Sequence, residues 1–241
     1  MDISRIAQDN LKALSKNAYP GRGIVMGLTP DAARFVQVYW IMGRSENSRN
    51  RVFVRDGDVV RTAPYDASKV KDPSLIIYNV ARPLGRKHIV SNGDQTDTIF
   101  DTLRGGGTFE EALFTRTFEP DAPNYTARIS GLTDLDDPQQ AYKLSVIKAP
   151  GGNPAHCTRQ FFSYEGGIAG YGHCVTTYAG DGSPLPAFEG EPRLLPIGEE
   201  PAAVAETYWT ALDGDNKISL LVKSIDRTTG RCELHIVNKH Q

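Results

Sequence analysis

The hydrophobic pattern of this chain changes its period several times, and this change constrains the fold more than any other feature. Apolar residues recur every three or four positions over 4–16, which predicts an amphipathic helix. From residue 23 onward, short apolar runs separated by turn residues predict strands. Two adjacent helical segments interrupt these strands near the middle of the chain. Because helices and strands do not alternate one for one, the pattern favours an α+β fold over a doubly wound sheet.

The predicted elements rest on periodicity and on the turn residues between them. Helices are predicted over 4–16, 96–103, a segment that begins after 108 and stops by Pro120, and 199–212. Strands are predicted over 23–28, 35–42, 52–55, 59–62, 75–80, 87–90, 126–131, 142–148, 158–164, 174–178, 218–225 and 232–237. Gly57 tolerates the positive φ of a tight hairpin, and Thr108 and Glu111 have capping-box spacing. We expect a single domain over residues 1–241.

Composition excludes several classes of protein. Hydrophobic residues make up 39% and charged residues 23%, as in ordinary globular domains. A net charge of −2 argues against a nucleic-acid partner, which normally requires a basic surface. No segment approaches the ~20 apolar residues that would span a membrane. The first ten residues lack the basic and apolar regions of an export signal, so we expect a cytoplasmic protein.

Two patterns resemble ligand sites but lack the required context. The pairs His156-Cys157 and His173-Cys174 do not have the spacing of zinc sites, and adjacent strand residues point to opposite faces. The glycines of 21–23 and 105–107 lack the strand-to-helix context or the lysine of phosphate-binding loops. We therefore expect no metal site, and we interpret both glycine clusters as structural.

Polar residues gather at the predicted ends of strands and helices, where sites are commonly assembled. These stretches are the arginine-rich loop 44–51, the pair 78–79, the helix entrance 91–97 and the segment 119–128. Arginine offers a planar set of donors that suits phosphate or a polarised carbonyl oxygen. Free backbone N–H groups at a helix entrance favour anions. Each stretch alone also fits a solvated surface turn, but together they indicate a binding site.

In this order, the same stretches resemble the archaeal-type IMP cyclohydrolase family, the stand-alone enzymes of the last step of purine synthesis. The matching motifs are Tyr19-Pro20-Gly21-Arg22, Arg44-Ser45, Asn50-Arg51, Tyr78-Asn79, Ser91-Asn92-Gly93, Thr96-Asp97, Glu119-x-Asp121 and Thr126-x-Arg128-Ile129. They cover about residues 19–180. The resemblance implies a four-layer αββα sandwich similar to the N-terminal-nucleophile hydrolases. It does not imply their chemistry, because no processed Ser, Thr or Cys nucleophile is evident.

The resemblance also implies a reaction: closure of 5-formamidoimidazole-4-carboxamide ribotide (FAICAR) to IMP and water. Both reacting groups belong to one molecule and nothing is oxidised, so we expect no cofactor. By resemblance, Arg51 stabilises the formyl oxygen, Glu119 is the base and Tyr78 supplies a proton to the departing water. The substrate-binding residues implied are Arg22, Arg44, Asn79, Asn92, Gly93, Thr96, Asp97 and Arg128.

The sequence departs from the family pattern in three places. The arginine loop is longer, so that either Arg49 or Arg51 can occupy the catalytic position; we prefer Arg51 because Asn50-Arg51 keeps the motif. Ala127 stands where a proline is expected, and the N-terminal helix and the region after Gly180 are elaborations.

Two other functions stay open at this stage. One is a non-catalytic purine-nucleotide-binding module, which the longer loop motivates, and the other is an amidohydrolase on a related fold. The expected partner is a small purine ribotide, not a nucleic acid or a membrane, and the sequence is compatible with a homo-oligomer.

Overall fold

The computed structural model describes residues 2–70 and 77–240. Within these residues the strands form two antiparallel sheets, one of six strands and one of seven. The first sheet has the order β11 (Arg193–Pro196), β10 (Tyr171–Thr176), β1 (Gly23–Leu28), β2 (Arg34–Met42), β12 (Lys217–Asp226) and β13 (Cys232–Asn238). The second has the order β3 (Val52–Asp56), β4 (Val59–Ala63), β5 (Asn79–Leu84), β6 (Lys87–Ser91), β7 (Arg128–Asp134), β8 (Tyr142–Lys148) and β9 (Thr158–Tyr164).

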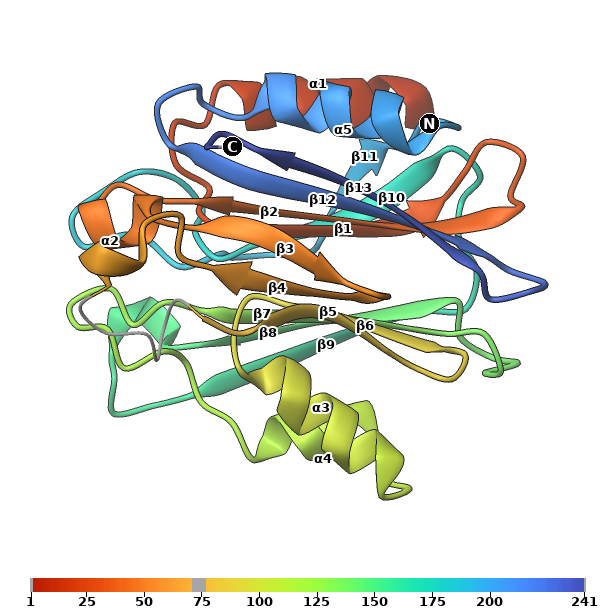
Figure 1. Cartoon of the computed structure of the whole chain (residues 1–241), viewed down its shortest axis with the longest axis horizontal. Helices are drawn as coiled ribbons and strands as arrows, with labels where there is room; N and C mark the ends of the chain where they lie inside the picture. Colours follow the sequence, from red (N-terminus) through yellow and green to blue (C-terminus); the bar gives the residue numbers. More distant parts are fainter. Residues whose placement is uncertain (1, 71–76, 241) are drawn as a thin grey trace.

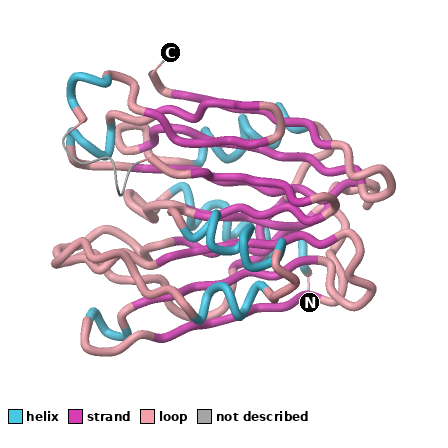
Figure 2. The backbone as a smooth tube through the Cα atoms, turned by 60° about the horizontal axis from the view of Figure 1, so that its bottom comes forward, coloured by secondary structure: helices cyan, strands magenta, loops and turns pink. Residues whose placement is uncertain are grey.

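The helices lie on the outer faces of the two sheets (Figure 1). Helices α1 (Ile3–Ser15) and α5 (Pro201–Ala211) cover the first sheet. Helices α3 (Gln95–Arg104) and α4 (Phe109–Phe114) cover the second, and in Figure 2 two helices lie across its strands. The described elements therefore stack in the order helices, sheet, sheet, helices, and the fold is α+β as expected.

Strand β2 explains how the first sheet is covered on both faces. Phe35, Tyr39 and Ile41 belong to the core between the sheets. Their neighbours Val38 and Trp40 belong to the core beneath α1 and α5. Because alternate residues of a strand point to opposite faces, a strand covered on both sides is apolar along most of its length. Gln37 is the buried polar exception in β2, and it donates to the His88 carbonyl.

Local sequence signals set several boundaries where they were predicted. The hairpin β3–β4 pairs Asp56 with Val59 across the predicted Asp-Gly turn. Helix α4 begins with the predicted capping box: the Thr108 side chain accepts from the Glu111 N–H, and the Glu111 carboxylate accepts from the Thr108 N–H. These contacts join residues close in sequence, so short-range patterns suffice to predict them.

Other boundaries differ from prediction for reasons of tertiary structure. The strand predicted over 75–80 falls partly outside the described residues, and β5 begins only at Asn79. Strand β7 begins at Arg128 and not at 126, because the Thr126 N–H donates to Asp121 instead of to a neighbouring strand. Strand β10 begins at Tyr171, three residues before the predicted start at Cys174. Helix α2 (Glu46–Arg49), β11 and the short 3₁₀ turns Ala67–Lys69 and Pro150–Gly152 were not predicted.

One side chain links the edges of the two sheets. Asn238, at the end of β13, accepts a hydrogen bond from the Phe53 N–H at 2.8 Å and donates to the Phe53 carbonyl at 3.1 Å. An asparagine can satisfy both backbone groups of one residue in this way. The link holds the start of β3, and with it Arg51, against the first sheet.

Candidate active site

Four buried polar side chains and one partly buried arginine meet between the two sheets, and we call them the central polar group: Tyr39, Arg51, Tyr78, Glu119 and the partly buried Arg22. Arg51 interacts electrostatically with each of the other four. Tyr39 is 0% exposed, Arg51 1% and Glu119 3%. The structure therefore brings together all three residues predicted to be catalytic, together with one predicted ligand and one tyrosine that was not predicted.

Two direct contacts join pairs of residues within the central polar group. The Arg22 guanidinium forms an ion pair with the Glu119 carboxylate, with 3.5 Å between Nη2 and Oε2. The hydroxyls of Tyr39 and Tyr78 are 2.9 Å apart. Two buried donors, Nη1 of Arg51 and Nε of Arg22, have no hydrogen-bond partner among residues 2–70 and 77–240. Because a buried donor without a partner is costly, these nitrogens point to an oxygen-rich ligand.

Burial and neighbouring charges act in opposite directions on the pKa values of Glu119, Arg51 and Arg22. Burial raises the pKa of Glu119, and Asp121 adds to this effect, whereas Arg22, Arg128 and Arg51 act to lower it. Burial lowers the pKa of Arg51. Burial also acts to lower the pKa of Arg22, but the neighbouring Glu119 carboxylate and tyrosines outweigh it, so that this pKa is raised. A carboxyl group with a raised pKa beside guanidinium groups is typical of acid–base sites.

A glycine turn places Arg22 in the group. Gly21 has a φ of 71°, in the left-handed region. A Cβ atom there would lie 2.2 Å from Thr177 Oγ1 and 2.5 Å from the Tyr178 ring. Only glycine fits this close approach, which explains the position of Gly21 immediately before Arg22.

The residue before Arg51 holds the arginine loop in place. Asn50 donates from Nδ2 to the Asp66 carbonyl at 2.7 Å, and its Oδ1 accepts from the Asp66 N–H at 2.7 Å. Arg51 then turns inward and donates from Nε to the Ser48 carbonyl at 2.8 Å. Arg49 instead bonds the Gly43 carbonyl at 3.0 Å. Of the two arginines left open by the sequence, Arg51 is the one that joins the central polar group.

A second set of predicted ligands lies at the entrance of α3. Asn92 donates to the Ala127 carbonyl at 2.9 Å and accepts from the Ile129 N–H at 2.8 Å. Arg128 donates from Nη1 to Asp94 Oδ1 and Gln95 Oε1, each at 2.7 Å. These side chains therefore hold the ends of β6 and β7 together. A Cβ on Gly93 would lie 2.7 Å from Arg128 Nη1, so this glycine packs directly against the pair.

The side chains of the remaining predicted ligands bond residues outside the central polar group. Thr96 is buried and donates to the Gly93 carbonyl at 3.2 Å. Asn79 donates to Asp97 Oδ1 at 2.9 Å, and Asp97 also pairs with Arg82 at 2.6 Å. Arg44 has a side chain that is 42% exposed, forms an ion pair with Asp181 and lies over the Tyr19 ring.

Sequence reasoning missed two tyrosines. Tyr39 lies inside the apolar run of β2, where no residue pattern marks it as polar. The Tyr178 hydroxyl lies 2.5 Å from Thr126 Oγ1, which also bonds Asp121. Burial raises the pKa of Tyr178 to about 12, against the opposing charge of Arg22. The motif residues of segment 119–126 were a signal for this contact, but they could not identify the partner, which lies just beyond the end of β10.

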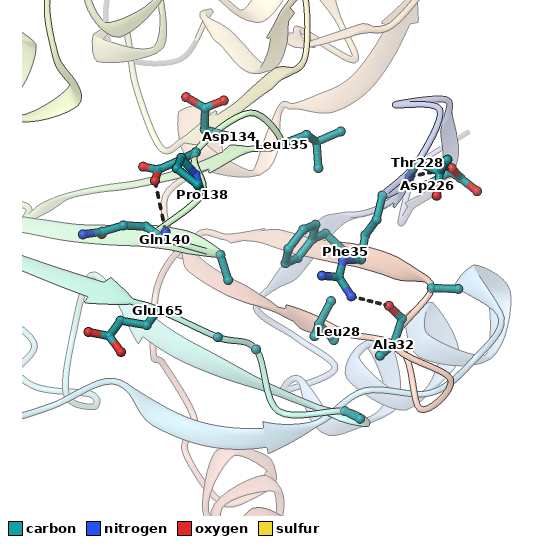
Figure 3. A pocket seen from close by; sticks show the side chains of 17 residues that line it. Leu28, Ala32, Phe35, Asp134, Leu135, Pro138, Gln140, Glu165, Asp226 and Thr228 are labelled. Carbon is teal, nitrogen blue, oxygen red and sulfur yellow. Dashed lines mark hydrogen bonds between the residues drawn. The ribbon is translucent and has the colours of Figure 1, made fainter.

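Two cavities help to locate the site. One of about 430 Å³ is lined by Arg44, Arg49, Asn50 and Lys69, among others, and so lies beside the arginine loop. Another of about 670 Å³ opens where β1 ends at Leu28, at the end of the sandwich away from Arg22. Figure 3 shows that the carboxylates of Asp134 and Glu165 at this second cavity point in different directions. None of the predicted site residues lines it.

The His-Cys pairs do not converge. His173 bonds the Tyr142 hydroxyl at 2.6 Å, while Cys174 packs in the core under α1 and α5. Among the described residues, no group of three or more His, Cys, Asp or Glu side chains can hold a metal ion. In the same part of the chain, no helix is long and apolar enough to cross a membrane.

The sandwich and its buried arginine–carboxylate group agree with a match to one protein family. The chain belongs to the family of IMP cyclohydrolase-like proteins, which matches it over residues 19–230. A protein named IMP cyclohydrolase from Methanopyrus kandleri is 34% identical over 119 residues, which are 48% of this chain and 59% of that protein. One from Methanococcus maripaludis strain C7 is 33% identical over 129 residues, 52% of this chain and 62% of that protein. The chain thus aligns with less than two thirds of the length of these relatives.

Proposed function

We propose that this protein is an IMP cyclohydrolase, which closes the ring of FAICAR and releases water. Family membership and the names of its relatives support this reaction. The observation that carries the proposal is Arg51, a buried guanidinium whose Nη1 has no hydrogen-bond partner among the described residues and which interacts electrostatically with Tyr78 and Glu119. Such a donor suits an oxygen on which negative charge develops.

In the proposed first step, the carboxamide nitrogen attacks the formyl carbon. Glu119 takes one proton from this nitrogen as the C–N bond forms, and Arg51 stabilises the formyl oxygen as it becomes negative. The raised pKa of Glu119 supports the role of base, since proton transfer is most efficient when the pKa of the base lies near the working pH. The buried position of the group supports Arg51, because a guanidinium acts more strongly where water is excluded.

In the second step, the carbinolamine loses water. The oxygen receives two protons in all: the first originates from the carboxamide nitrogen through Glu119, and Tyr78 donates the second. The C–O bond breaks, a C=N bond forms, and Tyr78 recovers its proton from the former formamide nitrogen. Enclosure of the substrate in its reactive conformation supplies part of the rate, within the ~7–11 kcal/mol available to ideal positioning.

We infer that the ribotide phosphate binds near the arginine loop and that Arg22, Arg44 and Arg128 contribute to it. The cavity of about 430 Å³ beside Arg44 supports this placement. Asn92, Gly93, Thr96, Asn79 and Asp97 would then act mainly by shaping the wall of the site, as their internal bonds indicate. The order of helices and sheets supports the likeness to the N-terminal-nucleophile hydrolases.

The activity test uses the full chain with FAICAR, following the purine absorbance and identifying IMP by mass. Arg51→Lys and Glu119→Gln are expected to lower kcat by about 10²–10⁴-fold. Arg55→Lys is the matched control and keeps wild-type turnover, because Arg55 of β3 is exposed and donates to the nearby Gly57 carbonyl. IMP binding without turnover would instead support the nucleotide-binding module. Release of an acid and an amine would support the amidohydrolase.

A further inference from the structure

Tyr39 is held rigidly beside Tyr78. It lies in the middle of the first sheet, paired with Ile24 of β1 and Leu221 of β12. Its ring stacks on Phe53 with 5.6 Å between ring centres. The side chain therefore has little freedom, and its hydroxyl can serve as a fixed reference point for its neighbour.

The Tyr39 hydroxyl has one hydrogen-bond partner among the described residues, the hydroxyl of Tyr78 at 2.9 Å. Burial raises the pKa of Tyr39 well above its usual range, and Tyr78 adds to this effect, while Arg22 and Arg51 oppose it. Tyr39 therefore keeps its proton. Either hydroxyl can be the donor in this pair. A Tyr39 proton directed at the Tyr78 oxygen satisfies the buried donor of Tyr39 and leaves the Tyr78 proton for another acceptor.

We propose that Tyr39 is a positioning residue for the ring closure: it donates a hydrogen bond to the Tyr78 oxygen, so that the proton of Tyr78 faces the substrate. This inference rests on the proposed function. When Tyr78 gives its proton to the departing hydroxyl, the O–H bond of Tyr78 breaks and its oxygen becomes negative. A hydrogen bond to that charged oxygen is stronger than one to the neutral hydroxyl, so Tyr39 stabilises the step more than the resting state.

The test compares Tyr39→Phe with Tyr208→Phe. Tyr208 is also 0% exposed and also makes one hydrogen bond, to the Pro196 carbonyl at 2.9 Å, but it belongs to α5 and packs in the core on the outer face of the first sheet. Both substitutions remove one buried hydroxyl, so both are expected to lower stability by similar amounts. Only Tyr39→Phe is expected to lower kcat, by about 10–100-fold, as for loss of a hydrogen bond to a charged group. The KM for FAICAR stays unchanged in both variants.

A double variant tests whether Tyr39 acts through Tyr78. Tyr39→Phe/Tyr78→Phe is expected to turn over no more slowly than Tyr78→Phe alone, because the hydrogen bond is already lost. A further drop equal to that of Tyr39→Phe would overturn the proposal. The proposal would also be overturned if Tyr39→Phe and Tyr208→Phe had the same kcat, or if Tyr39→Phe changed KM and left kcat unchanged. It would be overturned as well if Tyr39→Phe failed to fold while Tyr208→Phe folded. If the wild-type protein forms no IMP, the proposed function itself fails, and the two failures are thereby distinguished.

Discussion

Acidification is expected to destabilise this protein through one buried histidine. His88 of β6 is 1% exposed, and its ring faces β13 of the first sheet. Its Nδ1 lies 3.6 Å from Cys232 Sγ, its carbonyl accepts from Gln37, and its Nε2 has no partner among the described residues. Burial lowers the pKa of His88 from 6.5 to about 3, and the charges of Lys223 and Arg86 add to the shift.

The sign and size of the effect follow from proton linkage. The folded state keeps His88 neutral, whereas the unfolded chain binds a proton below its pKa of 6.5. The stabilisation is therefore complete above that pH and is lost as the pH falls toward about 3. Between about pH 8 and pH 5 the loss is of order 2 kcal/mol, because each pKa unit is equivalent to about 1.4 kcal/mol.

The assay is urea unfolding of wild type and His88→Leu at both pH values. Leucine has a similar volume and does not titrate, while Lys223, Cys232, Gln37 and Arg86 remain in both proteins. From about pH 8 to about pH 5, the free energy of unfolding is expected to fall in both proteins, but the fall in His88→Leu is about 2 kcal/mol smaller than the fall in wild type. Parallel losses in the two proteins would refute the reasoning, since they would show that His88 does not change its protonation on unfolding.

Three further outcomes follow from single contacts. The pH at which kcat falls on the acid side is expected to lie above the usual pKa of a glutamate, because burial raises the pKa of Glu119 and the base must be ionised. An acid-side midpoint at or below pH 4.5 would contradict the role of Glu119 as base. Gly21→Ala is expected to lower the free energy of unfolding by about 1–3 kcal/mol, because residue 21 has a positive φ and the new Cβ would meet Thr177. Gly57 has open space around it, so Gly57→Ala is expected to lower the free energy of unfolding by less. Thr108→Ala is expected to cost about 1 kcal/mol in urea unfolding through loss of the capping box, and a neutral effect would show that α4 does not depend on it.

The parts of the fold that were predictable depend on neighbours in sequence. Strand β8 has the predicted bounds Tyr142–Lys148, and β9 has Thr158–Tyr164. The hairpin at Gly57 and the cap at Thr108 were confirmed for the same reason. The start of β7 was predicted wrongly because a loop contact replaces strand pairing there: the Thr126 N–H donates to Asp121, five residues earlier. That residues 1–241 form one domain stays a prediction.

Within the site, motif order indicated which residues matter, but not what each contacts. Arg51, Tyr78 and Glu119 lie in one group as expected from the resemblance, although their catalytic roles stay proposals. Asn92 looked like a ligand by its motif, yet its side chain bonds the backbone of β7 and the residue before it. A polar side chain in a motif can serve the fold or the substrate, and the sequence does not separate these uses.

The sequence by itself determined the α+β composition, the hairpins and caps, and the family to which the chain belongs, because these depend on local periodicity and on motif order. Only the tertiary structure decided that Arg51 and not Arg49 turns inward, and that Tyr39 meets Tyr78. Tyr39 belongs to β2 of the first sheet, whereas Tyr78 directly precedes β5 of the second. The register of β2 and the packing of the sheets set the distance between them. No pattern within either segment contains that information, because the contact exists only after both sheets have packed.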